Sequence, residues 1–169
     1  IVGLAIDERG ILPAAEDRVA IARRITEAAL AVGIPREDIY IDCLTLTASA
    51  QQEGAVQTLE ALSRCKRELG VRTVLGVSNI SFGLPCRGYL NTTFLTMAMS
   101  AGLDLAIMNP NTPEMIAAVR AYRALTSQDL QSTDSGAAHA DVQLHTTQPS
   151  KSAAHVDDVD DRPHGRDDR

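Results

Sequence analysis

The stretch GVSNISFG, residues 76–83, continues the apolar segment TVL, the kind of run that a buried parallel strand requires. Polar residues replace the apolar ones as the strand ends, namely Ser78, Asn79 and Ser81, and Pro85 then closes the segment. In an α/β sheet these side chains stand at the carboxyl end of the strand, where ligands bind. The stretch therefore predicts a parallel strand that presents hydrogen-bonding groups at its tip.

A strand–helix plan repeats four times within residues 1–126. Apolar runs predict strands at residues 1–6, 39–41, 71–77 and 103–108. Apolar residues at helical spacing predict a helix after each strand, over residues 13–32, a segment ending at 69, 87–101 and 112–125. Four such units with short connections predict a parallel sheet with right-handed crossovers. Two architectures fit this pattern, a slice of a (β/α)8 barrel and a small doubly wound sheet.

Each predicted strand delivers a polar side chain at its carboxyl end. These side chains are Asp7, Asp42 with Thr45, Ser78 with Asn79, and Asn109. Because the carboxyl ends of parallel strands meet at one rim, we expect the four groups to face a common ligand. Aspartate and asparagine at strand ends also serve as turn residues or helix caps, which is an equal alternative for Asp7 and Asn109. That alternative suits Asp42 less well, because Cys43 and Leu44 keep the chain apolar beyond it, and it suits Asn79 least, because the next helix does not start for several residues.

Charge and cysteine usage restrict the class of partner. The formal net charge of −6 and the pI near 5.1 argue against a nucleic-acid partner, which needs a basic face. No apolar run is long enough to span a bilayer, and no signal peptide is recognisable. Cys43, Cys65 and Cys86 lack metal-ligand spacing, so we expect reduced thiols, a cytoplasmic protein and no metal site.

The composition changes near residue 127. All four histidines lie beyond it, whereas all five aromatic residues precede it. The last segment has no apolar period, is rich in serine, threonine and alanine, and carries an excess of aspartate. Such a segment cannot bury enough apolar surface to offset the entropy lost on ordering. We therefore expect a folded domain over residues 1–126 and a disordered acidic tail over residues 127–169.

Several familiar sites are excluded. The sequence has neither a GxGxxG stretch after a strand nor a GxxxxGK[ST] stretch, so the phosphate cradles of nucleotide and dinucleotide sites are absent. The folded part contains no histidine, which removes Ser-His-Asp and Cys-His mechanisms and histidine-ligated metals. No lysine lies at a strand end, which argues against a Schiff-base aldolase. Carboxylate and amide groups remain, and they suit a polar heterocycle.

Four segments carry a resemblance to a known family. They are IVGLAIDERGI, IYIDCLTLT, VLGVSNIS followed by Arg87, and LNTTFLTMAMSAGLDLAIMNP. Together they resemble the pterin-binding barrel of the methyltetrahydrofolate methyltransferases, namely the folate domain of cobalamin-dependent methionine synthase and the methyltetrahydrofolate:corrinoid/iron–sulfur protein methyltransferases. The likeness extends from Ile1 to about Asp129. It implies that the four units are the C-terminal half of a (β/α)8 TIM barrel, strands five to eight.

The resemblance implies roles for the two strongest candidates at the rim. Asn79 matches the asparagine that hydrogen-bonds N5 of the pterin, which makes it the implied catalytic residue. Asp42 matches the aspartate of the sixth strand that pairs with the edge of the pterin ring. The related dihydropteroate synthases use a lysine at the end of the seventh strand, where this sequence has Ser-Asn-Ile-Ser. The resemblance therefore favours methyl transfer.

Four further positions match residues of the family's pterin pocket. Gly76 and Ser78 correspond to its floor, Arg87 to an arginine near the ligand, and Ile107 to an apolar wall. Phe82 stands where one relative has a glutamine, so that contact is not carried over. The implied substrate is methyltetrahydrofolate, and the implied methyl acceptor is the cobalt of a cobalamin or other corrinoid on a partner domain or protein.

The first four strands of the barrel are missing from the sequence, together with another acid and amide of the family's site. The resemblance thus implies a fragment that needs an N-terminal half barrel and is inactive alone. Two unpaired sheet edges and an apolar inner face favour a homodimer or an aggregate. Three alternatives stay open: a structural half-barrel without catalysis, a dihydropteroate synthase-like pterin enzyme, and a four-stranded module that binds another small polar ligand.

Overall fold

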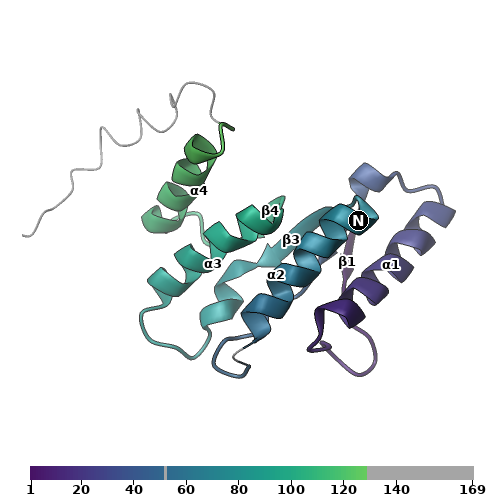
Figure 1. Cartoon of the computed structure of the whole chain (residues 1–169), viewed down its shortest axis with the longest axis horizontal. Coiled ribbons are helices and arrows are strands. Elements are labelled where there is room, and N and C mark those ends of the chain that lie inside the picture. The colour runs from purple at the N-terminus through teal and green to yellow at the C-terminus, as the bar shows by residue number, and fades with distance from the viewer. Residues whose placement is uncertain (52, 129–169) are drawn as a thin grey trace, which may run out of the picture.

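Four parallel strands in sequential order form the sheet. The computed structural model describes residues 1–51 and 53–128. The strands are β1 (Val2–Leu4), β2 (Tyr40–Asp42), β3 (Arg72–Gly76) and β4 (Leu105–Ile107), paired in the order β1-β2-β3-β4. The helices are α1 (Ala15–Ala31), α2 (Gly54–Arg64), α3 (Arg87–Ala101) and α4 (Pro113–Leu125), as Figure 1 shows. The predicted α/β fold with four parallel strand–helix units is confirmed.

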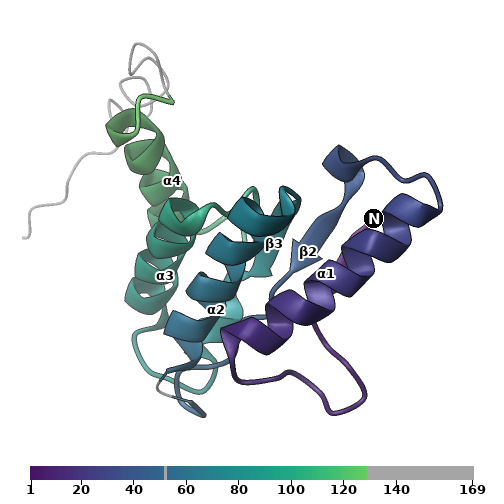
Figure 2. The same cartoon turned by 45° about the vertical axis from the view of Figure 1, so that its right-hand side comes forward.

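The helices decide between the two predicted architectures. Figures 1 and 2 show α1, α2 and α3 side by side on the same face of the sheet. Side chains that point to that face, such as Ile41 and Leu75, are fully buried. On the opposite face Leu4 is 48% exposed and Ile107 58% exposed, because no helix covers them. A doubly wound sheet has helices on both faces, so this sheet is a barrel segment whose inner face is open.

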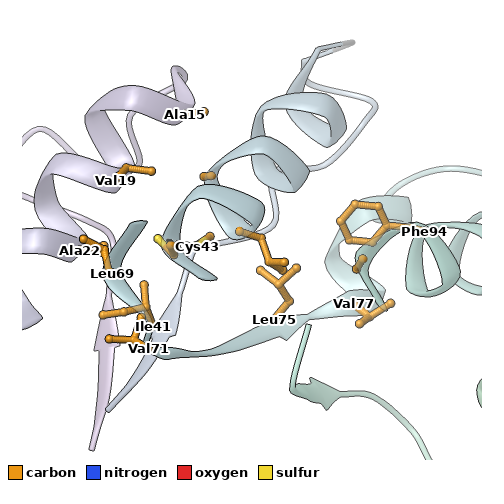
Figure 3. Close-up of a cluster of buried hydrophobic side chains, with 14 of the residues drawn as sticks. Ala15, Val19, Ala22, Ile41, Cys43, Leu69, Val71, Leu75, Val77 and Phe94 are labelled. Carbon is orange, nitrogen blue, oxygen red and sulfur yellow. Dashed lines mark hydrogen bonds between the residues drawn. The ribbon is translucent and has the colours of Figure 1, made fainter. Parts of the chain in front are cut away.

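The hydrophobic core lies between the sheet and the helices. Figure 3 shows Val19 and Ala22 of α1 facing the strands, with Leu75 and Val77 reaching toward Phe94 of α3. Gly3 lets α1 approach closely, since a Cβ at this position would stand only 2.5 Å from Cγ2 of Ile25. The core therefore fixes the sheet against the helices and leaves the strand ends to carry polar groups.

The strands are shorter than the apolar runs predict. The predicted strand at residues 71–77 ends at Gly76, because Val77–Ser81 turns into a 3-10 helix, η3. The predicted second helix ends with a π-helical turn, η2 (Cys65–Leu69), capped by the left-handed Gly70. A short 3-10 helix, η1 (Arg36–Asp38), precedes β2. Of these three segments, η3 follows a strand and places a turn, rather than extended strand, at the carboxyl rim, whereas η1 and η2 precede strands and lie at the opposite end of the sheet.

The predicted tail lies almost wholly outside the described residues, so the domain boundary at 126 and 127 stays a prediction. Within residues 1–51 and 53–128, no helix is long and apolar enough to cross a membrane.

Candidate functional site

The loops after β2 and β3 are joined to one another at the carboxyl rim of the sheet. The backbone N–H of Ala48 donates to the carbonyl of Ile80 over 2.9 Å. The hydroxyls of Thr47 and Ser49 both donate to the carbonyl of Phe82, over 3.0 and 3.1 Å. These bonds hold the loop that follows Asp42 against the turn that carries Asn79.

Asp42 ends β2 on the open face of the sheet. Its register partners are Leu4 and Val74, so its side chain shares their face. It is 8% exposed, and its Oδ1 accepts the backbone N–H of Leu44 over 2.8 Å. Burial raises the pKa of Asp42, while the Leu44 hydrogen bond lowers that pKa to a smaller extent. No ion pair involves this carboxylate in the described part of the chain, which leaves its second oxygen available to a ligand.

Asn79 lies in η3 with its side chain folded back over Gly76. A Cβ on Gly76 would stand 3.0 Å from Nδ2 of Asn79 and 3.6 Å from its Cγ. Glycine at position 76 is therefore what lets the amide occupy this place. The Asn79 side chain is exposed, and it has no hydrogen-bond partner among the residues that the structure describes. Both its donor and its acceptor are available at the rim.

Arg87, the first residue of α3, holds this turn from its other side. Its Nη2 donates to the carbonyl of Ser78 over 3.0 Å, and its Nε donates to Oγ of Ser81 over 2.9 Å. The Ser81 hydroxyl in turn donates to Oδ1 of the buried Asn91 over 2.7 Å. The contacts of Arg87 thus fix the backbone that carries Asn79.

Gly76 and Ile107 are partners in the register between β3 and β4. Ile107 therefore stands beside the Asn79 turn, on the open face of the sheet. Its exposed side chain offers an apolar wall next to the two polar groups. The structure thus brings five of the six predicted site positions (Gly76, Ser78, Asn79, Arg87 and Ile107) together around β3, and the loop contacts add Asp42.

The other two polar strand ends are committed to their own loops. Asp7 accepts the backbone N–H of Arg9 over 2.9 Å and pairs with the Arg9 guanidinium over 2.6 Å. These hydrogen bonds lower the pKa of Asp7. Oδ1 of Asn109 accepts the backbone N–H of Asn111 over 2.9 Å. Both contacts favour the turn-residue alternative for Asp7 and Asn109.

The cysteines form no metal site in the described part of the chain. Within residues 1–51 and 53–128, no group of three histidine, cysteine or acidic side chains could hold an ion. Cys43 and Cys65 are buried free thiols with their sulfur atoms 3.8 Å apart, and Cys86 is exposed. The hydrogen bond between the two thiols and their burial raise the pKa of Cys43.

Sequence reasoning missed Arg18, a buried arginine of α1 that contacts the loop after β2. The signal lies in its spacing. Position 18 belongs to the stripe of buried positions that includes 15, 22 and 29, where an apolar residue is expected.

A parallel sheet covered by helices on one face, with an aspartate and an asparagine on adjoining loops at its carboxyl rim, is typical of part of a (β/α)8 barrel, in which the ligand site lies at that rim. Residues 12–109, more than half of the chain, match the family model described as pterin binding enzyme. The chain belongs to this family of pterin-binding enzymes.

Known relatives agree with the family resemblance found in the sequence. The chain is 40% identical over 117 residues to the methionine synthase of Mycobacterium leprae, and 41% identical over 117 residues to that of Mycobacterium tuberculosis. Each match covers 64% of this chain and 10% of the relative. The methylcorrinoid:tetrahydrofolate methyltransferase of Eubacterium limosum is 29% identical over 132 residues, which cover 76% of this chain and 48% of that protein. The chain therefore spans about a tenth of the first two relatives and about half of the third. The predicted family is confirmed.

Proposed function

We propose that the chain supplies half of the pterin site of a methyltransferase, which moves the N5 methyl group of methyltetrahydrofolate to the cobalt of a corrinoid. The observation that carries this proposal is the pair formed by Asp42 and Asn79. Loops that are bonded to each other hold the two residues, and each residue keeps a polar atom available. The names of the relatives, methionine synthase and methylcorrinoid:tetrahydrofolate methyltransferase, support the same reaction class.

Asp42 is suited to binding the ring. An ionised carboxylate that accepts N–H groups from the pterin edge makes charge-assisted, directional hydrogen bonds. The Leu44 N–H occupies one carboxylate oxygen and fixes the plane of the group. Because burial raises the pKa of this carboxyl, binding through the ionised form weakens as the pH falls through the raised value.

Asn79 is suited to the transfer step. Removing a methyl group from N5 leaves an amine anion unless N5 gains a proton. An amide is no acid at neutral pH, but it accepts or donates a hydrogen bond that strengthens as N5 becomes protonated. Such an interaction stabilises the transition state more than the ground state. Arg87 supports it through the Ser78 carbonyl and the Ser81 hydroxyl.

Lysine placement favours methyl transfer over a dihydropteroate synthase-like reaction. Lys66 is the one lysine in residues 1–128. Its Nζ pairs with Asp104 over 2.7 Å, just before β4 begins and therefore at the opposite end of the sheet from Asn79. The rim formed by these residues thus lacks the lysine that the resemblance assigns to the synthases.

The half site requires the other half of a barrel. The sheet ends in two strands, β1 and β4, which each have one paired neighbour, and its inner face exposes Leu4 and Ile107. We propose that an N-terminal half barrel covers this face and completes the pterin pocket, and that a corrinoid-bearing domain or protein approaches the rim. On this proposal the chain alone is inactive.

Isothermal titration calorimetry with methyltetrahydrofolate tests the proposal, using the chain alone and the chain joined to an upstream half barrel. We expect saturable binding by the joined protein and none by the chain alone. A joined protein that folds cooperatively but shows no heat of binding would contradict the pterin site. Binding without methyl transfer to a corrinoid protein would instead support the alternative of a non-catalytic half-barrel.

A further inference from the structure

Arg18 places a guanidinium group inside the protein, beneath the rim. The residue is 0% exposed, and its hydrogen-bond acceptors in the described part of the chain are all neutral oxygen atoms. Nε donates to the carbonyl of Leu12 over 2.6 Å, and Nη2 donates to the carbonyl of Pro13 over 3.1 Å. Nη1 donates to the carbonyls of Cys43 and Leu44, over 3.3 and 3.2 Å. One side chain therefore joins the loop before α1 to the loop that follows Asp42.

Core packing alone does not account for this arginine. A buried charge is expensive unless hydrogen bonds or an opposite charge compensate it, and an apolar residue of similar volume is often equally stable. No carboxylate pairs with Arg18 in the described part of the chain. Its guanidinium group instead donates hydrogen bonds to several carbonyl oxygens, and the five N–H donors of its planar fork are suited to this. The loop at Leu44 shows what this arrangement achieves.

Leu44 adopts a left-handed backbone conformation, with φ of 62°. A leucine in this region is strained, and such strain persists only where surrounding contacts over-determine it. Its N–H donates to Oδ1 of Asp42, while its carbonyl accepts Nη1 of Arg18 and lies 3.3 Å from the hydroxyl of Thr58. The strained residue is thus held at one end by Arg18, and at its other end it holds the carboxylate.

We propose that Arg18 is a positioning residue for the pterin site, which locks the left-handed turn at Leu44 and so orients the Asp42 carboxylate toward the ligand. This inference rests on the proposed function of the site. It assigns Arg18 an effect on ligand binding that it exerts through Leu44, without touching the ligand itself.

The test compares Arg18→Lys, the double variant Arg18→Lys with Leu44→Gly, and Arg23→Lys as a matched control, all in the complete barrel. Arg23 lies on the same helix and makes an exposed contact with Glu68. Lysine keeps the charge at position 18 but cannot reproduce the forked contacts. Glycine adopts the left-handed conformation without strain, so it removes the need for the lock.

We expect Arg18→Lys to raise the Kd for methyltetrahydrofolate by about tenfold, the size typical of losing one hydrogen bond to a charged group. The rate of transfer at saturating substrate should stay within about twofold, because Asp42 binds ground and transition states alike. The double variant should recover most of the lost affinity. The Arg23→Lys control should bind methyltetrahydrofolate with the same Kd as the parent.

Two outcomes of the single variant, and a third outcome of the double variant, would overturn the inference. One is an unchanged Kd for a folded Arg18→Lys protein, and the other is a loss in the transfer rate alone, which indicates only a smaller folded fraction. Failure of Leu44→Gly to restore binding would also count against it.

A second measurement does not depend on the pterin. Carbon-13 NMR of the Asp42 carboxyl gives its pKa in the parent and in the variants. The register neighbours of Asp42 on the adjacent strands are Leu4 and Val74, which do not titrate, and the next residue in its own loop is Cys43. Because the Leu44 N–H lowers the pKa of Asp42, Arg18→Lys should raise that pKa and Leu44→Gly should restore it. A pKa that does not move overturns the positioning role. If the pKa moves as expected and the parent binds no pterin, the proposed function alone has failed.

Discussion

Replacing Asn79 by alanine separates catalysis from folding more clearly than any other change at the rim. The Asn79 side chain is exposed, it lies close to Gly76, and it bonds to no other side chain among the described residues. Removing it therefore breaks no internal hydrogen bond that the structure shows. The free energy of unfolding should change by less than about 0.5 kcal/mol, the usual range for a surface substitution.

The expected effect on methyl transfer is much larger. Losing one preorganised hydrogen bond to a transition state typically lowers the rate by ~10²–10³, about 3–4 kcal/mol. Single-turnover methyl transfer to a corrinoid protein, measured in the complete barrel beside equilibrium binding of methyltetrahydrofolate, gives both quantities. We expect the transfer rate to fall by that factor and the Kd to change far less.

Asn109→Ala is the matched control. Asn109 also ends a strand at the rim, but its amide oxygen accepts the N–H of Asn111 and closes its own turn. Its replacement should cost about 1 kcal/mol of stability through the lost hydrogen bond and leave the transfer rate unchanged. If Asn79→Ala keeps the transfer rate within about twofold of the parent, well below the expected loss, Asn79 is only a turn residue and the reasoning is refuted.

Four other outcomes are expected. Asp42→Asn should raise the Kd for methyltetrahydrofolate before it affects transfer, as calorimetry will measure. Because burial raises the pKa of Asp42 in the folded protein, its ionisation destabilises the fold as the pH rises above about 4. The same variant should therefore melt at a higher temperature than the parent at pH 7, and an unchanged or lower melting temperature would count against this pKa shift. Gly76→Ala should displace the Asn79 amide, because the new Cβ would stand 3.0 Å from Nδ2. We expect slower methyl transfer and an unchanged circular dichroism spectrum. Transfer at the parent rate would show that the close approach of Asn79 to Gly76 is not required. The isolated chain should dimerise or aggregate through its open face, and a clean monomer in sedimentation at high concentration would contradict this.

The sequence predicts the framework of the fold well because that framework depends on local periodicity. Apolar runs and helical spacing indicate four strand–helix units, and glycines such as Gly70 and Gly102 end helices as expected. The sequence also predicts which polar residues follow the strands. It does not predict their roles, because the pairing of Asp7 with Arg9 depends on how the loop between them folds back.

Arg18 shows why part of the site escapes sequence reasoning. Helical spacing places it on the buried face of α1, but periodicity does not indicate which acceptors lie there. Its carbonyl partners come from loops on both sides, and they converge only when the sheet and helix pack. The left-handed conformation of Leu44 is hidden for the same reason, because leucine gives no local signal for it.

The sequential order of the strands has a consequence for how such a chain folds. Each strand pairs with the strand that comes next in the sequence, so no pairing waits for a segment made much later. Each pairing spans one strand–helix unit, 38 residues from Val2 to Tyr40 and 31 residues from Val74 to Leu105, and none in the described sheet skips a unit. Units of this type can assemble in the order in which a ribosome releases them. On the proposed function the N-terminal half barrel is released first, so these four strands can add one after another to a half that has already been made, and their open face is covered as they do so.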